Sequence, residues 1–291
     1  MVQEEAYEKI SSTAKLVAHV RTLTDIPFTK EIAAASGAEK DFQTLTGKSA
    51  EFMTQFASLL EARYKATDRI IARYHITQVL EIAAGLSPRG LAMTENPNVV
   101  YEATDLPQIL EEEKEIAESI LAKLNIHRPN LYYRIANALD RESLLQAAIT
   151  FQSGKPIAII TEGLLDYLTR EEKETLAGNI HYFLKQHDGI WITPDVNTKQ
   201  SRKLFSQAYG NIRQLIQNIS GATERDMEKN AFEDENEMRQ FFTKAGFTIE
   251  EYPYSNVLED LSSVKLSNLN QEEILEILQM LKTLILTIHS S

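Results

Sequence analysis

The fold of this chain is decided by the stretch Val79-Leu80-Glu81-Ile82-Ala83-Ala84-Gly85-Leu86-Ser87-Pro88-Arg89-Gly90. It reads as an apolar strand with an acid near its end, followed by a turn of small residues and by Pro88, where a helix can begin. An open α/β sheet binds a nucleoside cofactor at such a strand-to-helix turn. The stretch therefore predicts both a fold class and the place of a ligand.

The spacing within the turn indicates which cofactor it can hold. A pyrophosphate needs a G-x-G-x-x-G loop, whose backbone N–H groups close around it. Ala83 and Ser87 interrupt that spacing, and only Gly85 and Gly90 remain. Glu81 would repel a phosphate but suits a cationic amino group. The turn therefore favours S-adenosylmethionine, which has no phosphate, over a dinucleotide.

Composition narrows the class of protein. The chain has 291 residues, with 30 basic and 42 acidic side chains and a net charge of −12. An acidic protein without a basic stripe is a poor candidate for binding nucleic acid or an anionic membrane. Because the chain has no cysteine, disulfides, thiolate catalysis and Cys-based metal sites are excluded. The N-terminus lacks the features of a signal peptide and no uncharged run could span a bilayer, so we expect a cytoplasmic protein.

The hydrophobic pattern divides the chain near residue 75. Before it, Lys15–Leu23 and Ala50–Tyr74 read as amphipathic helices. From Thr77 strands alternate with helices, as in a parallel sheet. We expect strands at Gln78–Ile82, Val99–Ala103, Leu131–Ala136, Pro156–Ile160, Gly189–Thr193 and Phe247–Tyr252. We expect helices between and after them at Ser87–Met93, Pro107–Leu124, Arg141–Thr150, Arg170–Gln186, Lys199–Asn218 and Glu235–Lys244.

The C-terminal segment allows two interpretations. We favour a helix to about Met280 followed by a strand over the β-branched run Thr283–Ile288. One continuous helix is the alternative. The first choice predicts a Rossmann-like α/β fold with seven strands, the last two antiparallel, and helices on both faces. Residues 1–75 would form a helical lid on a cofactor domain of residues 76–291, as one compact unit.

Three segments in order carry a resemblance to a known family. They are Val79–Arg89, Tyr101–Pro107 and Thr161–Leu168. They resemble the signature segments of the leucine carboxyl methyltransferase family, which includes bacterial carboxyl O-methyltransferases of polyketide biosynthesis, of the tetracenomycin type. Residues 13–21 are similar to the family's N-terminal helix, and Arg63 stands where the family has an arginine before the first strand.

This resemblance implies an activity as well as a fold. It implies a class I methyltransferase sheet, S-adenosylmethionine as cofactor, and methylation of a carboxylate of a small molecule. Two positions depart from the family pattern. The first turn of the family is richer in glycine and has an aspartate where Ser87 stands, and Asn137 stands where the family often has an aspartate.

Residue roles follow from the resemblance together with the chemistry of each side chain. Asp105 could accept the ribose hydroxyl protons, or it could cap the helix that starts at Pro107. Glu81 could meet the cofactor's ammonium group or structure the turn. Asn137 could accept from the adenine amine or be a simple loop residue, and Glu162 could lie at the methionine end or cap the next helix. Glu102 points to the other face in a regular strand, or takes the place of Asp105 if the register is shifted.

Cations on the predicted lid could bind either carboxylate of the reaction, that of the cofactor or that of the acceptor. Lys15 and Arg63 are assigned to this role, whereas Arg21 and Arg89 are not placed in the site. Tyr167 is expected to position the acceptor. The full expected cofactor set is Lys15, Arg63, Glu81, Ala83, Gly85, Asp105, Leu106, Asn137, Ala138, Leu139, Glu162 and Gly163.

Methyl transfer from a sulfonium is an in-line displacement, so positioning supplies most of the catalysis. A carboxylate acceptor is already ionised and needs no general base, whereas a hydroxyl acceptor would need one. The six histidines are scattered, and no metal site is expected. Two other functions remain open at this point: a nicotinamide-dependent oxidoreductase and a catalytically silent S-adenosylmethionine-binding protein. The sequence does not fix the acceptor or the oligomeric state.

Overall fold

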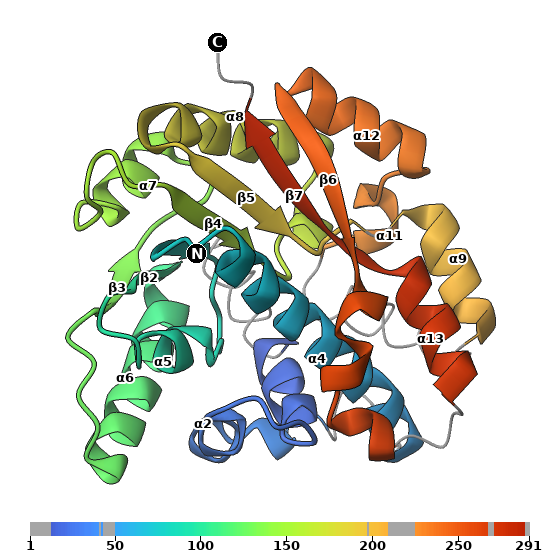
Figure 1. The fold of residues 1–291 in the computed structure, drawn as a ribbon, viewed down its shortest axis with the longest axis horizontal. Helices are drawn as coiled ribbons and strands as arrows, with labels where there is room; N and C mark the ends of the chain where they lie inside the picture. The colour runs from blue at the N-terminus through green and yellow to red at the C-terminus, as the bar shows by residue number, and fades with distance from the viewer. Residues whose placement is uncertain are drawn as a thin grey trace.

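The structure, a computed structural model, describes residues 13–40, 42, 50–196, 198–208, 225–266 and 271–288. Its centre is a seven-stranded sheet with the order β3-β2-β1-β4-β5-β7-β6 (Figure 1). The strands are β1 Gln78–Ile82, β2 Val100–Asp105, β3 Leu131–Ile135, β4 Ile157–Thr161, β5 Gly189–Thr193, β6 Phe247–Pro253 and β7 Lys282–Ile288. The predicted seven-stranded α/β sheet is therefore confirmed.

The strand order creates a switch point at the middle of the sheet. β1 pairs in parallel with β2 on one side and with β4 on the other, so the chain leaves β1 in one direction and later returns on its other flank. The carboxyl ends of β1 to β5 meet at one edge, where open α/β sheets bind ligands. β7 runs antiparallel to both β5 and β6, as expected for the last two strands.

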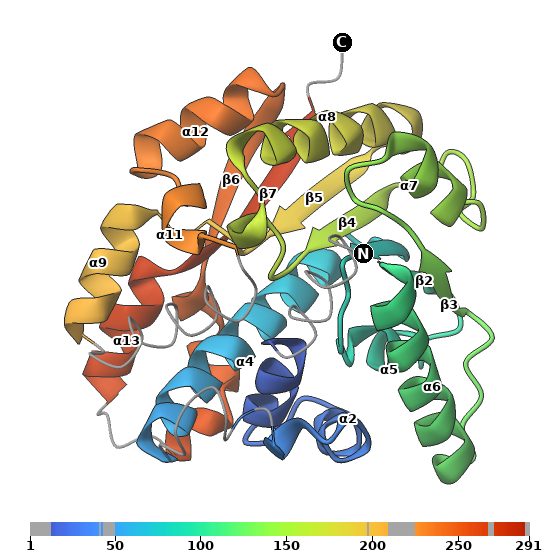
Figure 2. The same ribbon diagram turned by 180° about the vertical axis from the view of Figure 1, so that it is seen from behind.

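Helices cover both faces of the sheet (Figures 1 and 2). Alternate strand residues point to opposite faces, so Leu80 packs into one buried cluster and Val79 into another. The first cluster includes residues of α8 (Arg170–His187) and α12 (Glu235–Lys244). The second includes the end of α4 (Ala50–Arg73). Both apolar faces of the sheet are thereby removed from water.

Local signals account for the ends of these helices. α8 begins with a capping box, in which the Thr169 hydroxyl accepts from the backbone of Glu172 and the Glu172 carboxylate accepts from the backbone of Thr169. α6 (Pro107–Leu124) starts with proline at its first turn and ends at Asn125, whose φ of 54° is left-handed. Its predicted bounds are confirmed.

Several predicted boundaries were wrong by two or three residues. β2 continues past Ala103, because Thr104 and Asp105 still pair with β3. α5 (Arg89–Met93) begins after the predicted Ser87, whose hydroxyl is engaged in the turn.

Two other helices also differ from expectation. α7 (Arg141–Ala147) is shorter than the predicted Arg141–Thr150. α9 is Lys199–Ala208, and the rest of the helix predicted to Asn218 lies outside the described residues.

The C-terminal segment is a helix followed by a strand. α13 spans Gln271–Met280 and β7 follows it directly. The β-branched run is buried between two neighbouring strands, with Leu284, Ile285 and Leu286 at most 1% exposed. The alternative of one continuous helix was wrong, because a helix could not supply the backbone hydrogen bonds that β5 and β6 require.

The N-terminal helices pack over the carboxyl edge of the sheet. Residues 13–21 are helical, where Lys15–Leu23 was predicted, and α2 spans Thr29–Ser36. Ala18 and Ile32 share a buried cluster with Ile116 of α6. The expected boundary at residue 75 falls between α4 and β1. Of the helices that the structure describes, none combines the length and the apolar character needed to cross a membrane.

Glu61 ties α4 to a distant part of the chain. Its fully buried carboxylate accepts backbone N–H groups of Ser262 and Ser263, both at 2.9 Å, and both serine hydroxyls. It also forms a 2.7 Å ion pair with Lys65. Burial alone would raise the pKa of Glu61, but the hydrogen bonds from Lys65 and the serines outweigh it and lower the pKa to about 2.

Replacing this carboxylate should destabilise the fold. We expect Glu61→Ala to reduce the free energy of unfolding by about 2–4 kcal/mol, measured by urea denaturation at pH 7, because several buried donors lose their acceptor. The exposed Glu259→Ala is the control. Since the folded pKa lies below the unfolded one, the contribution is complete above about pH 4.5 and is lost as the pH falls toward 2. Equal stability of the two variants at pH 7 would contradict this role.

Candidate active site

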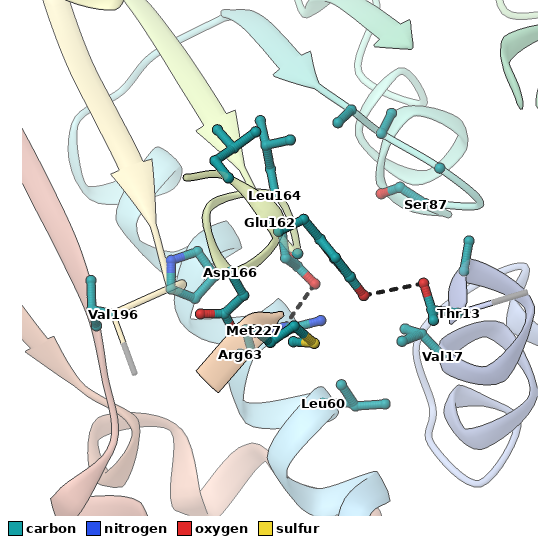
Figure 3. A pocket seen from close by; sticks show the side chains of 18 of the residues that line it. Thr13, Val17, Leu60, Arg63, Ser87, Glu162, Leu164, Asp166, Val196 and Met227 are labelled. Atoms are coloured by element: carbon teal, nitrogen blue, oxygen red, sulfur yellow. Dashed lines mark hydrogen bonds and ion pairs between the residues drawn. The ribbon is translucent and has the colours of Figure 1, made fainter. Parts of the chain in front are cut away.

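A cavity of about 690 Å³ lies at the carboxyl ends of the central strands (Figure 3). Its wall on the sheet side is formed by the turn after β1 and by the residues that follow β2, β3 and β4. The opposite wall comes from helical residues 13–21 and from α4. The position is the switch point at which such folds bind cofactors.

The cavity brings together most of the residues expected in the site. Those that line it are Arg63, Glu81, Ala83, Gly85, Asp105, Leu106, Asn137, Ala138, Leu139, Glu162, Gly163 and Tyr167. Lys15 is not among the lining residues, and its ammonium pairs with Glu112 at 2.7 Å. The structure gives no support to a contact between Lys15 and a ligand in the cavity.

The turn after β1 is held in an unusual backbone conformation. Ala83 and Gly85 have φ angles of 56° and 58°, both left-handed. Such a conformation costs a residue with a side chain about 1–2 kcal/mol, and strain of this kind concentrates at functional sites. Asp105 stabilises the turn, because its Oδ2 accepts the N–H of Gly85 at 2.9 Å.

Asp105 has the geometry expected of a ribose acceptor. It ends β2, is 6% exposed, and accepts one N–H on each oxygen, from Gly85 and from Leu106 at 2.8 Å. The cap residue of α6 is Leu106, so the alternative role of Asp105 as a helix cap was wrong. Burial raises the pKa of Asp105 to about 6, although the two backbone N–H groups oppose the shift.

Glu162 is the centre of a buried cluster of charges. Its carboxylate receives Nη2 of Arg21, Nε of Arg63 at 3.0 Å and Nη2 of Arg89 at 2.9 Å. Burial would raise the pKa of Glu162, but the three guanidinium groups outweigh it and hold the pKa well below its usual range. Glu162 is thus ionised, and it joins the end of β4 to three helical segments rather than capping the next helix.

Glu81, near the end of β1, bonds to side chains of the turn that follows it and of β2. It pairs with Nη1 of the fully buried Arg89 at 2.6 Å and accepts the hydroxyls of Tyr101 at 2.5 Å and Ser87 at 3.1 Å. A carboxylate from β1 therefore forms an ion pair with Arg89. At position 87, where the family usually has an aspartate, this chain has a serine that donates to the same carboxylate. Asp68 also pairs with Arg89, at 2.8 Å.

The sequence analysis did not place Arg21, Arg89 and Asp195 in the site. Arg21 lines the cavity, whereas Arg89 and Asp195 hold residues that line it. Neither arginine was assigned a role, yet both are buried on Glu162. Asp195 follows β5 and accepts N–H groups of Gly163, Leu164 and Leu165 at 2.7–3.1 Å. An acid directly after an apolar strand is a signal that could have indicated it.

The far side of the cavity holds the groups expected near an acceptor. Tyr167, on the short helix η1 (Leu165–Tyr167), donates its hydroxyl to Thr13 at 3.2 Å (Figure 3). Burial raises the pKa of Tyr167 to about 12, so the phenol is neutral at physiological pH. Asp166 pairs with Arg202 at 2.7 Å. In the part of the chain that the structure describes, no cluster of acidic or histidine side chains could hold a metal.

Asn137 uses its side chain locally. Its Oδ1 accepts the N–H of Leu139 at 2.9 Å, which shapes the loop after β3. A carbonyl oxygen has two lone pairs, so this bond leaves room for a second donor. The loop role is therefore shown, and the adenine contact stays a prediction.

Comparison with known proteins identifies the family. A sequence profile described as leucine carboxyl methyltransferase matches residues 12–181, more than half of the chain. The chain belongs to this family. The resemblance of the three segments is confirmed. The family is one of methyltransferases, which agrees with the predicted enzyme class and disfavours a nicotinamide oxidoreductase.

A relative from Mycolicibacterium smegmatis, assigned as an S-adenosyl-L-methionine-dependent methyltransferase, is 27% identical over 194 residues. The match covers 59% of this chain and 62% of the relative. A structure of a DUF574 family protein from Streptomyces avermitilis superposes with a TM-score of 0.57 at 13% identity, over 96% of this chain and 97% of that one. A structure from Thermobifida fusca, assigned as a methyltransferase, superposes with a TM-score of 0.55 at 14% identity. The superposition covers 95% of this chain and 94% of that one. The fold is that of a class I methyltransferase.

The Asp105 carboxylate should make cofactor affinity depend on pH. Because the ionised form is the better acceptor, we expect the affinity for S-adenosylhomocysteine, measured by calorimetry, to fall as the pH drops through about 6. Asp105→Asn should weaken binding at pH 7.5 by about 1–3 kcal/mol and remove much of this dependence. A pH profile unchanged by the substitution would assign the effect to another group, such as Asp195, whose pKa burial also raises to about 6.

Proposed function

We propose that the protein transfers the methyl group of S-adenosylmethionine to the oxygen of a carboxylate on a small acceptor. The observation that carries this proposal is the chemistry of the cavity wall: it offers guanidinium groups and a neutral phenol, and none of the described lining residues is a histidine. A site of this kind can orient an anionic oxygen. The lining acids Asp166, Glu172 and Glu235 are each held in an ion pair with a basic residue, which disfavours them as the base that a neutral hydroxyl would need.

The cavity residues fit the cofactor in three places. Asp105 retains lone pairs on both oxygens for the ribose hydroxyls. The loop at 137–139 after β3 lies beside it and would border the adenine. Among the described residues, Arg63 donates only through Nε, to Glu162, and its two terminal nitrogens could bind a carboxylate. When bound, the cofactor would supply an electrophilic methyl group on a cationic sulfur.

The acceptor would lie between the lid helices and the far wall. Apolar side chains line this region, among them Val17, Leu60 and Val196 (Figure 3). The Tyr167 hydroxyl is neutral, and when the acceptor binds it would turn its single O–H from Thr13 to one oxygen of the acceptor. The chain's residues would then hold the second oxygen in line with the methyl group, which is the main requirement of the reaction.

The proposal predicts a choice between acids and alcohols of matched shape. With isotopically labelled S-adenosylmethionine, we expect label to appear in esters of a panel of aliphatic and aryl carboxylic acids, and the label should be released by mild alkali. The alcohols of the same skeletons should receive at least tenfold less. Labelled ethers in place of esters would overturn the carboxylate assignment, and cofactor binding without any transfer would favour a catalytically silent protein.

Arg63 should matter for the reaction more than for the fold. Arg63→Ala removes donors from the cavity, but Glu162 keeps two arginines, so the thermal midpoint should shift by only a few degrees. We expect kcat/KM or the affinity for S-adenosylhomocysteine to fall at least tenfold, as for the loss of a charged hydrogen bond. Arg69→Ala on the same helix, which is 53% exposed, is the control. Equal kinetics of the two variants would remove Arg63 from the site.

A further inference from the structure

Arg21 has donors that the protein itself does not use. Its side chain is 5% exposed and lines the cavity. It gives Nη2 to Glu162, and its guanidinium lies 5.4 Å from the centre of the Tyr64 ring. Its Nε is buried without a hydrogen-bond partner, and none of the described residues accepts from Nη1. A buried guanidinium with unmet donors is costly unless a ligand completes it.

The ion pairs around Arg21 are unevenly distributed. Arg89 is met by Glu81 and Asp68, in addition to its bond to Glu162. Arg21 and Arg63 are then left to share the single carboxylate of Glu162.

Among the described residues, no acid other than Glu162 forms an ion pair with Arg21 or Arg63. Asp166 is paired with Arg202, and Asp195 is directed to three backbone N–H groups. The cavity therefore contains two adjacent guanidinium groups with one shared anion, which is the arrangement that a carboxylate ligand would complete.

We propose that Arg21 and Arg63 form a two-arginine site for the carboxylate of a ligand, with Arg21 in the role that the family resemblance gave to Lys15. The two guanidinium groups converge on one oxygen of Glu162, so they lie close enough to share a second carboxylate. Lys15 cannot take this part in the structure, because it is turned to Glu112. The ligand carboxylate is either that of the cofactor's methionine end or that of the acceptor. This inference rests on the proposed function.

Three probes separate the two sources of the carboxylate. S-adenosylhomocysteine carries the amino-acid carboxylate, and 5′-methylthioadenosine has the same nucleoside and thioether without it. Octanoate, added in the presence of saturating S-adenosylhomocysteine, reports on the acceptor side. Each is titrated by calorimetry into the wild type, Arg21→Met, Arg21→Lys and the exposed control Arg69→Met, and the thermal midpoint of each variant is measured.

We expect Arg21→Met to lower the affinity for S-adenosylhomocysteine by roughly 10- to 100-fold and the affinity for 5′-methylthioadenosine by less than twofold. This result would assign the site to the carboxylate of the cofactor. An unchanged affinity for S-adenosylhomocysteine, together with an affinity for octanoate that falls about tenfold or more, would assign the site to the acceptor. If Arg21→Met does not fold, Arg21→Lys carries the same comparison, because an ammonium keeps the charge but cannot supply several directed donors.

The proposal would be overturned if Arg21→Met, or Arg21→Lys in its place, bound all three probes as Arg69→Met does. It would also be overturned if S-adenosylhomocysteine and 5′-methylthioadenosine weakened equally, since the carboxylate would then play no part. If the wild type does not bind octanoate, the comparison of S-adenosylhomocysteine with 5′-methylthioadenosine alone decides whether Arg21 binds a carboxylate. A wild type that binds no S-adenosylhomocysteine would instead refute the proposed function.

Discussion

The carboxylate of Glu162 is the interaction on which the arrangement of this protein depends. It directly follows the central strand β4, and the three arginines bound to it come from the N-terminal helix, from α4 and from α5. One side chain therefore fixes the positions of segments that are up to 141 residues apart in the sequence. The walls of the cavity are set by the same contacts that hold the lid onto the sheet.

Burying so many charges is expensive, and the structure shows how the cost is met. Arg89 is fully buried, but it has an acidic partner for each of its three nitrogens and the ring of Tyr64 at 4.4 Å. Tyr101 and Ser87 donate to Glu81 in turn. Such networks add little net stability, but leaving one member unpaired is costly. The cluster thus favours one geometry of the turn, which is what a site that works by positioning requires.

The sequence predicted the sheet well because each central strand is short, apolar and followed by a helix signal. The positions of Asp105, Glu162 and Gly85 followed from the same rule, since each lies at or just beyond the carboxyl end of a strand that ends at the ligand edge. The roles of Arg21 and Arg89 could not be read in this way. A lone arginine on an amphipathic helix is usually solvated, and only the fold shows that distant helices direct these side chains to one carboxylate.

Lys15 shows the opposite limit. Its place in a family-like segment suggested a ligand contact. Successive residues of a helix point about 100° apart, so the segment alone does not fix the direction of the side chain, and Lys15 points to Glu112 of α6. Ala83 shows a third limit: its left-handed backbone is invisible in the sequence, because alanine gives no hint of that conformation.

The place of β7 in the sheet has a consequence for how the protein is made. In the sheet that the structure describes, β6 lies at the edge and pairs with β7 alone, and β7 comes later in the chain. While a ribosome is still synthesising α13, β5 therefore has an open edge and β6 has no neighbour. Such unpaired strands invite aggregation, so a nascent chain halted before residue 282 should depend on chaperones in a way that the finished protein does not.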